Sequence, residues 1–167
     1  VYDAINGSKD VINSSNFYWD SIQKVYYVRD KKYSKIKSEN EVFGWHPYWM
    51  GSAWESYPFE LLSTISYFSY KLDPNTGSYT NPRQMEEWRT TAMIDSAKLK
   101  KTKVLLTVSS HGYKNNNSFL GDQSKWGVLI DSLSTLLLDR DADGVDINFE
   151  NLPYLKRGSF NRFIEEL

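Results

Sequence analysis

Cysteine is absent from this sequence, and histidine occurs only at positions 46 and 111. Without cysteine there are no disulfides, thiolate metal sites or cysteine nucleophiles, and two histidines argue against a multi-histidine metal site. No apolar run approaches the roughly 20 residues that a membrane-spanning helix needs. The net charge of −1 argues against a nucleic-acid-binding protein, because such proteins usually carry a basic surface.

Aromatic residues are abundant, at 16% of the chain, with 12 Tyr and 6 Trp. Some of them must belong to a core. A surplus of Tyr and Trp also suits sugar binding, because the apolar face of a pyranose stacks on a ring while the polar tip forms a hydrogen bond. For each single ring, an ordinary core or surface position is the alternative.

Residues 1–40 show little regular pattern and contain turn-forming groups of Asn, Gly and Ser. They are interpreted as an N-terminal extension or linker with some short structure. The stretch 24–37 is rich in Lys and Arg, which predicts a solvated segment, with a nucleic-acid patch as the alternative. Residues 1–10 are polar and lack the basic start of a signal peptide, a property that a mature secreted chain shares.

From residue 41 the hydrophobic pattern becomes regular. Short runs rich in β-branched and aromatic residues predict strands at 41–45, 62–70, 103–108 and 143–149. Helical periodicity predicts helices at 83–100, at 123–139 and from about residue 158 onward. Strands that alternate with helices predict an α/β fold with a parallel sheet. Periodicity alone does not distinguish a doubly wound sheet from a barrel.

The most informative run lies at 143–150 and reads Asp-Gly-Val-Asp-Ile-Asn-Phe-Glu. In a strand its three apolar side chains share one face, and Asp146, Asn148 and Glu150 share the other, about 7 Å apart from one to the next. Burying such a polar row is costly unless the groups are paired or used. Glu150, at the end of the strand, is a candidate general acid. The alternative is a purely structural network in an unrelated α/β protein.

This run resembles the signature Asp-Gly-x-Asp-x-Asp-x-Glu of glycoside hydrolase family 18, the chitinases and related endo-N-acetylglucosaminidases. Asp143, Gly144, Asp146 and Glu150 match, while Asn148 stands where the family has Asp. The resemblance implies a (β/α)8 TIM barrel with the signature on its fourth strand. Functional side chains of barrels gather at the C-terminal ends of the strands. Four predicted strands are half of eight, so residues 41–167 are expected to be the first half of a barrel, with the remaining half as a partner.

Three other strand ends extend the resemblance. The segment 44–49 resembles the family's first strand, where aromatic residues line the cleft, and 67–70 resembles the second strand. The segment 108–112 lies where the family has Ser-x-Gly-Gly, with His111 in place of a glycine. The resemblance thus implies a set of substrate-binding residues: Trp45, Tyr48, Trp49, Tyr70, Ser109 and His111. A catalytic role for His111 is the alternative.

The activity that the resemblance implies is substrate-assisted, retaining hydrolysis of β-1,4-linked N-acetylglucosamine glycans. In that scheme Glu150 protonates the leaving oxygen, and residue 148 holds the substrate's acetamido N–H while the acetamido oxygen attacks. Asp146 lies behind it, and Asp143 supports the strand. Asn148 can accept the N–H but carries no charge, and loss of one preorganised group commonly costs about 10²–10³ in rate. Glycoside hydrolase family 85 resembles 147–150 in having Asn two residues before the catalytic Glu.

Two functions therefore stand beside the structural alternative. One is a glycosidase acting on chitin-type glycans or on the chitobiose core of N-glycans. The other is a catalytically impaired, lectin-like barrel disabled at Asn148. In both cases the expected partner is an N-acetylglucosamine-containing oligosaccharide or polysaccharide, with no cofactor, metal, nucleic acid or membrane span. The resemblance implies a secreted, periplasmic or cell-surface location.

Overall fold

The computed structural model describes residues 9–10, 17–20, 25–28 and 40–167. The chain divides into two compact units, Val1–Asn40 and Glu41–Leu167. In the first unit, three short strands form an antiparallel sheet in the order β1 (Lys9–Asp10), β2 (Phe17–Asp20) and β3 (Val25–Val28). The rest of the expected N-terminal extension, including most of the basic stretch 24–37, lies outside the described residues.

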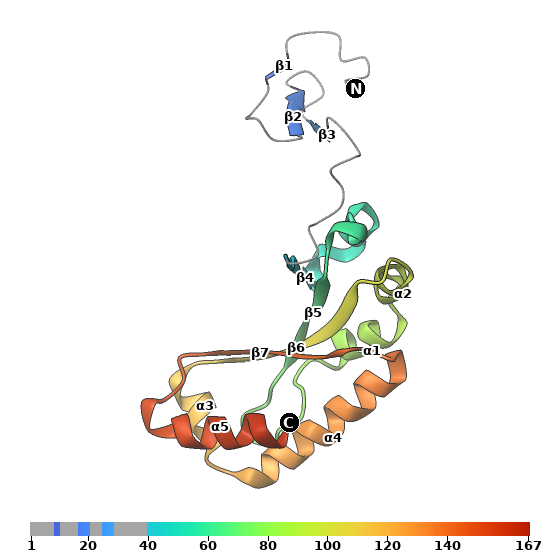
Figure 1. The fold of residues 1–167 in the computed structure, drawn as a ribbon. Helices are drawn as coiled ribbons and strands as arrows, with labels where there is room; N and C mark the ends of the chain where they lie inside the picture. The colour runs from blue at the N-terminus through green and yellow to red at the C-terminus, as the bar shows by residue number, and fades with distance from the viewer. Residues whose placement is uncertain (1–8, 11–16, 21–24, 29–39) are drawn as a thin grey trace. The chain divides into compact units, whose positions relative to one another are not determined.

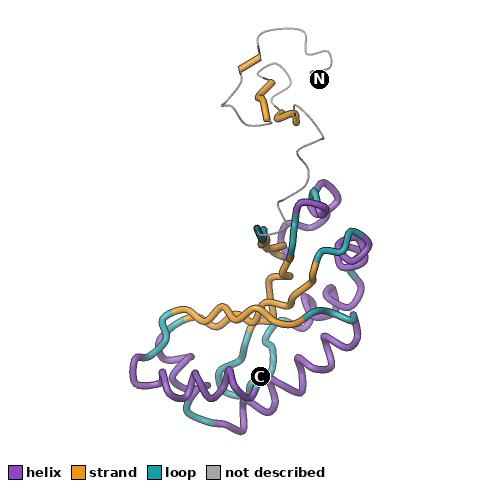
Figure 2. Tube along the Cα trace, in the orientation of Figure 1, coloured by secondary structure: helices purple, strands orange, loops and turns teal. Residues whose placement is uncertain are grey.

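The second unit contains a parallel four-stranded sheet in the order β4-β5-β6-β7 (Figures 1 and 2). Its strands are β4 (Phe43–Pro47), β5 (Thr64–Lys71), β6 (Lys103–His111) and β7 (Gly144–Glu150). Each connection returns the chain to the start of the next strand through helical segments, as parallel pairing requires. The predicted α/β fold with a parallel sheet is confirmed.

Five α-helices accompany the sheet in this unit. They are α1 (Pro82–Thr90), α2 (Ala92–Leu99), α3 (Tyr113–Leu120), α4 (Gln123–Arg140) and α5 (Arg157–Glu166). Three 3₁₀ segments, η2 (Tyr48–Ser56), η3 (Phe59–Leu61) and η4 (Tyr154–Lys156), lie in the connections. Helices α3, α4 and α5 lie on the same side of β6 and β7 (Figure 1).

The predicted single helix at 83–100 is wrong, because the chain breaks it at Thr91. This residue has an extended backbone with ψ of 131°, and its hydroxyl accepts a hydrogen bond from the Met93 N–H. Thr hydroxyls favour such capping positions over helix interiors. The result is a pair of short helices, α1 and α2. Helix α3 carried no clear sequence signal and was not predicted.

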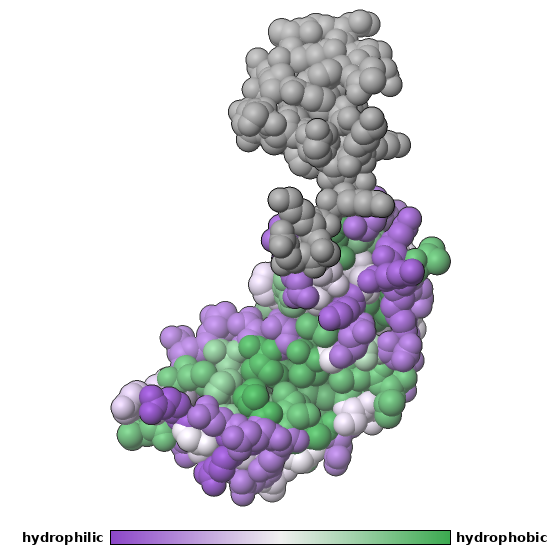
Figure 3. Space-filling model, viewed as in Figure 1, coloured by the Kyte–Doolittle hydropathy of each residue, from purple (hydrophilic) through white to green (hydrophobic). Residues whose placement is uncertain are grey.

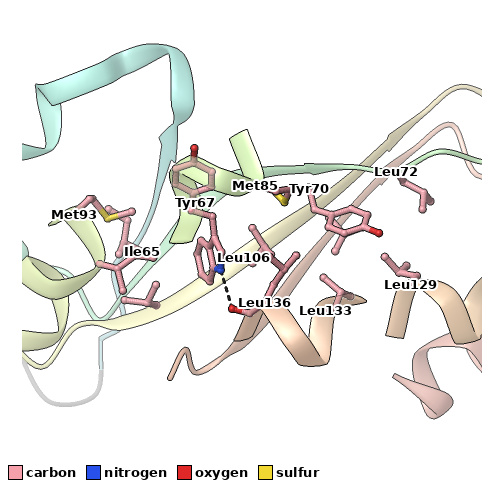
Figure 4. Packing of buried hydrophobic residues seen from close by; sticks show 14 of the residues in the cluster. Ile65, Tyr67, Tyr70, Leu72, Met85, Met93, Leu106, Leu129, Leu133 and Leu136 are labelled. Atoms are coloured by element: carbon pink, nitrogen blue, oxygen red, sulfur yellow. Dashed lines mark hydrogen bonds between the residues drawn. The ribbon is translucent and has the colours of Figure 1, made fainter. Parts of the chain in front are cut away.

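The core lies between the sheet and these helices (Figure 4). Val104, Leu106 and Val108 alternate along β6 and are fully buried. Two buried indoles tie the helices together. Trp88 Nε1 donates to the Leu136 carbonyl over 2.8 Å, and Trp126 Nε1 donates to the Phe119 carbonyl over 3.0 Å. Buried indole N–H groups need such partners, so these bonds fix how α1, α3 and α4 pack.

Strand β7 forms one edge of the described sheet. Its helix-facing side chains, Val145, Ile147 and Phe149, are only partly buried although they pack against the core. Figure 3 shows apolar side chains gathered where Figure 1 draws β7 beside helices α4 and α5. An apolar face beside the free edge of a strand is typical of a surface that another element covers.

His46, on β4, gives the fold a dependence on pH. Its side chain is 1% exposed and lies with Nδ1 3.2 Å from the Tyr57 hydroxyl, and burial lowers its pKa below 6.5. The unfolded chain therefore takes up this proton more readily than the folded chain. The stabilisation is fully present above pH 6.5 and is lost as pH falls from 6.5 toward the folded pKa.

We expect the thermal midpoint of unfolding to fall between pH 7.5 and pH 5.5, and His46→Gln to flatten this dependence. The matched control is His111→Gln, because the His111 side chain is 49% exposed. Equal pH dependence in the parent and in His46→Gln, measured by circular dichroism, would contradict the assignment.

Candidate functional site

The polar row of β7 lies on the face of the strand opposite the helices. Strand register pairs Asp146 with Thr107 and Asn148 with Ser109, and places Glu150 beside His111. The alternation predicted for 143–150 is therefore present, since Phe149 contacts the aromatic rings of the helices. Glu150 ends its strand at the C-terminal edge of the parallel sheet, the edge at which barrels carry their functional side chains.

Asp146 anchors a hydrogen-bond chain that crosses all four strands. Its Oδ2 accepts from Trp45 Nε1 over 2.8 Å and from Thr107 Oγ1 over 2.9 Å. Thr107 Oγ1 in turn lies 2.7 Å from Ser66 Oγ. A carboxylate only accepts, so the Thr107 proton points at Asp146 and Ser66 donates to Thr107. These bonds fix the Asp146 side chain.

Asn148 is the middle side chain of the polar row. Within the described part of the chain, its amide has no hydrogen-bond partner, although the amides of Asn116 and Asn81 are both engaged. The side chain is partly exposed and lines a cleft. An amide in this position can both accept and donate a hydrogen bond to a ligand.

The Glu150 carboxyl is accessible to a ligand, with a side chain 58% exposed. Its Oε2 lies 3.4 Å from His111 Nδ1, and His111 is the one basic side chain within 4 Å of this carboxyl among the residues that the structure describes. The carboxyl is thus open to solvent on one side and flanked by an imidazole on the other. This arrangement suits a group that exchanges a proton with a bound molecule.

An open cleft of about 570 Å³ lies beside Asp146 and Asn148, while Glu150 is not among its lining residues. Its lining residues are Trp45, Pro47, Trp49, Phe68, Asp146, Ile147 and Asn148. The Trp49 side chain is 62% exposed and meets the Phe68 ring edge-on, with centroids 5.9 Å apart. Aromatic walls with a few convergent polar groups are typical of sugar sites. Phe68 was not predicted as a site residue.

The other expected substrate-binding residues have different surroundings. Tyr48 packs edge-on against Trp49, with ring centroids 5.1 Å apart, and is partly open to solvent. Ser109 is 3% exposed, and its hydroxyl lies 2.7 Å from the Ser69 hydroxyl. Ser109 therefore supports the pairing of β5 with β6 from a buried position.

The expectation that Tyr70 binds substrate is wrong. The register of β5 against β6 shifts between Phe68 and Tyr70, so Ser69 has no register partner on β6 and forms a β-bulge. This bulge turns Tyr70 toward the helices, where it is fully buried and its hydroxyl donates to the Gly77 carbonyl over 2.9 Å. Burial raises the pKa of Tyr70 to about 12, so the phenol stays neutral.

Asp143 lies beyond the opposite end of β7, roughly 20 Å along the strand from Glu150. Its Oδ2 accepts from the Val104 N–H over 2.7 Å, and its own N–H donates to the Val104 carbonyl over 2.8 Å. This double contact starts the pairing of β6 with β7. The position fits support of the strand and is remote from the cleft.

The described residues contain no group of three or more His, Asp or Glu side chains that could hold a metal ion. They also contain no helix that is both long enough and apolar enough to cross a bilayer.

Comparison with solved structures shows that this sheet and its helices have the fold of the chitinase-type (β/α)8 barrel. A chitinase from Bacteroides thetaiotaomicron matches with a TM-score of 0.64 at 15% identity, over 75% of this chain and 41% of that one. A class V chitinase from tobacco matches with a TM-score of 0.64 at 16% identity, over 77% and 38%. The Bacillus cereus spore cortex-lytic enzyme SleL matches with a TM-score of 0.62 at 14% identity, over 75% and 30%.

These likenesses concern the fold. No protein-family model matches the chain, and no curated protein matches it in sequence. The chain spans 30–41% of the length of the three structures, which corresponds to its four parallel strands among the eight of a barrel. The predicted fold, about four βα units of a family-18-like barrel, is confirmed.

Proposed function

We propose that this protein is a glycosidase of the family 18 type, which cleaves β-1,4-linked N-acetylglucosamine glycans with retention of configuration. The observation that carries the proposal is the accessible Glu150 carboxyl at the C-terminal end of β7. It lies two residues from Asn148, which lines an aromatic cleft and whose amide has no hydrogen-bond partner among the described residues. The likeness of fold to chitinases supports it. Complexes of tobacco and Cycas revoluta chitinases with N-acetylglucosamine oligomers support this class of ligand.

In the proposed mechanism the substrate's 2-acetamido oxygen attacks the anomeric carbon while Glu150 protonates the departing glycosidic oxygen. Asn148 accepts the acetamido N–H and orients the attacking oxygen. Asp146, held by Trp45 and Thr107, supplies a fixed negative charge behind Asn148. Water then attacks the anomeric carbon from the face that the leaving group has vacated, and Glu150 takes up its proton. The bond between the anomeric carbon and the acetamido oxygen breaks, so the configuration is retained. Trp49 and Phe68 offer stacking surfaces for sugar rings.

We propose that the full barrel contains further βα units, which pair with β7 and cover its partly buried apolar side chains. This remaining half of the barrel would complete the substrate subsites. With this substrate class we propose a secreted, periplasmic or cell-surface location.

A lectin-like barrel is the second candidate, and the neutral Asn148 favours it. A carboxamide orients an acetamido group but stabilises a cationic intermediate less than a carboxylate does. Such a protein would bind the same oligosaccharides without cleaving them.

The deciding experiment incubates the full-length protein with chitotetraose and, separately, with cellotetraose, and follows products by mass spectrometry. Chitotetraose should be cleaved with retained anomeric configuration by NMR. Cellotetraose should remain intact, because its 2-hydroxyl cannot replace the acetamido nucleophile. Cleavage of both would refute substrate assistance, and binding without cleavage would favour the lectin-like candidate. Parallel reactions with a high-mannose N-glycan and with peptidoglycan identify the natural glycan.

Asn148→Asp is expected to raise kcat on chitotetraose by about 10²- to 10³-fold, because it restores a charge opposite the developing oxazolinium ion. Ser109→Ala, beside it on β6, is the control, since its buried hydroxyl faces Ser69. An unchanged or lower kcat for Asn148→Asp, from initial rates at saturating substrate, would show that the amide already serves the reaction fully.

A further inference from the structure

The end of β7, directly after the proposed general acid, is held by two hydrogen bonds to one carbonyl. The Glu150 C=O accepts from Asn116 Nδ2 over 2.6 Å and from the Gly112 N–H over 3.1 Å. The next residue, Asn151, has a φ of +61°, in the left-handed region that side chains other than glycine rarely adopt. Such a conformation persists only when its surroundings enforce it. The two donors therefore fix the peptide group on which the orientation of Glu150 depends.

Asn116 is the buried member of this contact. It is fully inaccessible to solvent, lies in helix α3, and its Oδ1 accepts from Ser110 Oγ over 2.7 Å. Both ends of its amide are thus occupied, one by β6 and the other by the last residue of β7. Its backbone N–H donates to the Gly112 carbonyl, which holds the start of α3 against the same strand ends.

A packing role alone does not explain this amide. Asn is a poor residue for a helix interior, and a buried amide costs free energy unless every polar atom is paired. The neighbouring Asn115 and Asn117 on the same helix are exposed. An aliphatic residue at 116 would fill a core position equally well, but it could not donate a hydrogen bond to the Glu150 carbonyl.

We infer that Asn116 is a positioning residue for Glu150: through its bond to the Glu150 carbonyl it fixes where the carboxyl delivers its proton. The inference rests on the proposed glycosidase function and extends it to a helix that contributes no group to the cleft lining. A displacement of about 1 Å of a reacting group can cost about 10²-fold in rate. His111, the last residue of β6, lies beside Glu150 in the strand register, and its Nδ1 is 3.4 Å from Glu150 Oε2.

The test uses two substrates that differ in their need for an acid. Chitotetraose releases a sugar, whose oxygen must be protonated, whereas 2,4-dinitrophenyl N,N′-diacetylchitobioside releases a stable phenolate without a proton. For Asn116→Ala in the full-length protein we expect kcat/KM to fall about 10- to 100-fold on chitotetraose and less than about threefold on the dinitrophenyl substrate. Asn117→Ala, the adjacent exposed asparagine, should change neither value.

Ser110→Ala provides a milder variant, because it removes only the hydroxyl that holds Asn116 Oδ1. Its loss of kcat/KM should be smaller but should again be confined to chitotetraose. This variant keeps the test valid if Asn116→Ala does not fold. Equal losses on both substrates, or none, in whichever variant retains the parental circular dichroism spectrum would overturn the inference while leaving the glycosidase intact. A parent that cleaves neither substrate would instead refute the proposed function, and the inference with it.

Discussion

Glu150→Gln is expected to lower kcat on chitotetraose by about 10²–10⁴-fold, the range that a positioned general acid contributes. Gln has nearly the same shape as Glu and keeps hydrogen-bonding capacity, but it has no acidic proton to give the leaving oxygen. Because the Glu150 side chain is 58% exposed and His111 is the one basic side chain within 4 Å of it among the described residues, the change should leave folding and oligosaccharide affinity almost unaltered.

Initial rates and isothermal titration with chitotetraose measure the two effects separately. Glu165→Gln is the matched control, because Glu165 is an exposed carboxylate on α5. Retained turnover in Glu150→Gln would assign the acid to another residue. A parent without turnover, whose affinity for chitotetraose equals that of the variant, would establish the lectin-like alternative.

Gly77→Ala is expected to destabilise the second unit by roughly 3–5 kcal/mol, the sum of backbone strain and overpacking. Gly77 follows β5 with a φ of +83°, and an added Cβ would lie 2.1 Å from the Lys125 carbonyl oxygen at the start of α4. That oxygen is main chain and cannot turn aside as a side chain can. The Gly77 carbonyl also accepts the Tyr70 hydroxyl, so a shift of this loop would disturb a buried bond.

Gly127→Ala is the contrasting substitution. Gly127 is an exposed residue within α4, and an added Cβ meets nothing within 4 Å. Alanine there should stabilise the protein by about 0.5–1 kcal/mol, because glycine is unfavourable in a helix interior. Urea unfolding of both variants measures the difference. A loss below about 1 kcal/mol for Gly77→Ala would mean that α4 moves away from this loop without difficulty.

Periodicity and a local motif predicted much of the second unit. The four strands lie within a few residues of their expected bounds, and the alternation of β7 is present. These features depend on neighbours along the chain, which a sequence displays directly. The break at Thr91 was not predicted, because a single Thr does not interrupt the helical periodicity of 83–100. Its role as the N-cap of α2 becomes clear from the hydrogen bond that its hydroxyl accepts from the Met93 N–H.

The parts of the site that sequence did not predict depend on contacts between distant residues. Tyr70 was misplaced because a bulge against β6 reverses which side of the sheet it faces. Asn116 is one of three consecutive asparagines, and only tertiary burial separates it from its neighbours. Trp45 was expected as a sugar platform, but its indole N–H also binds a carboxylate 101 residues away.

That indole–carboxylate bond has a consequence for shape. Trp45 and Asp146 belong to β4 and β7, the outermost strands of the described four. In a flat sheet, strands three positions apart would be separated by roughly 14 Å, with parallel side chains that never meet. Here the two side chains are 2.8 Å apart, donor to acceptor, across the intervening β5 and β6. The sheet is therefore concave on this face, with Trp45–Asp146 as a chord across the arc, and any strand that adds to β7 meets an edge already bent toward closure.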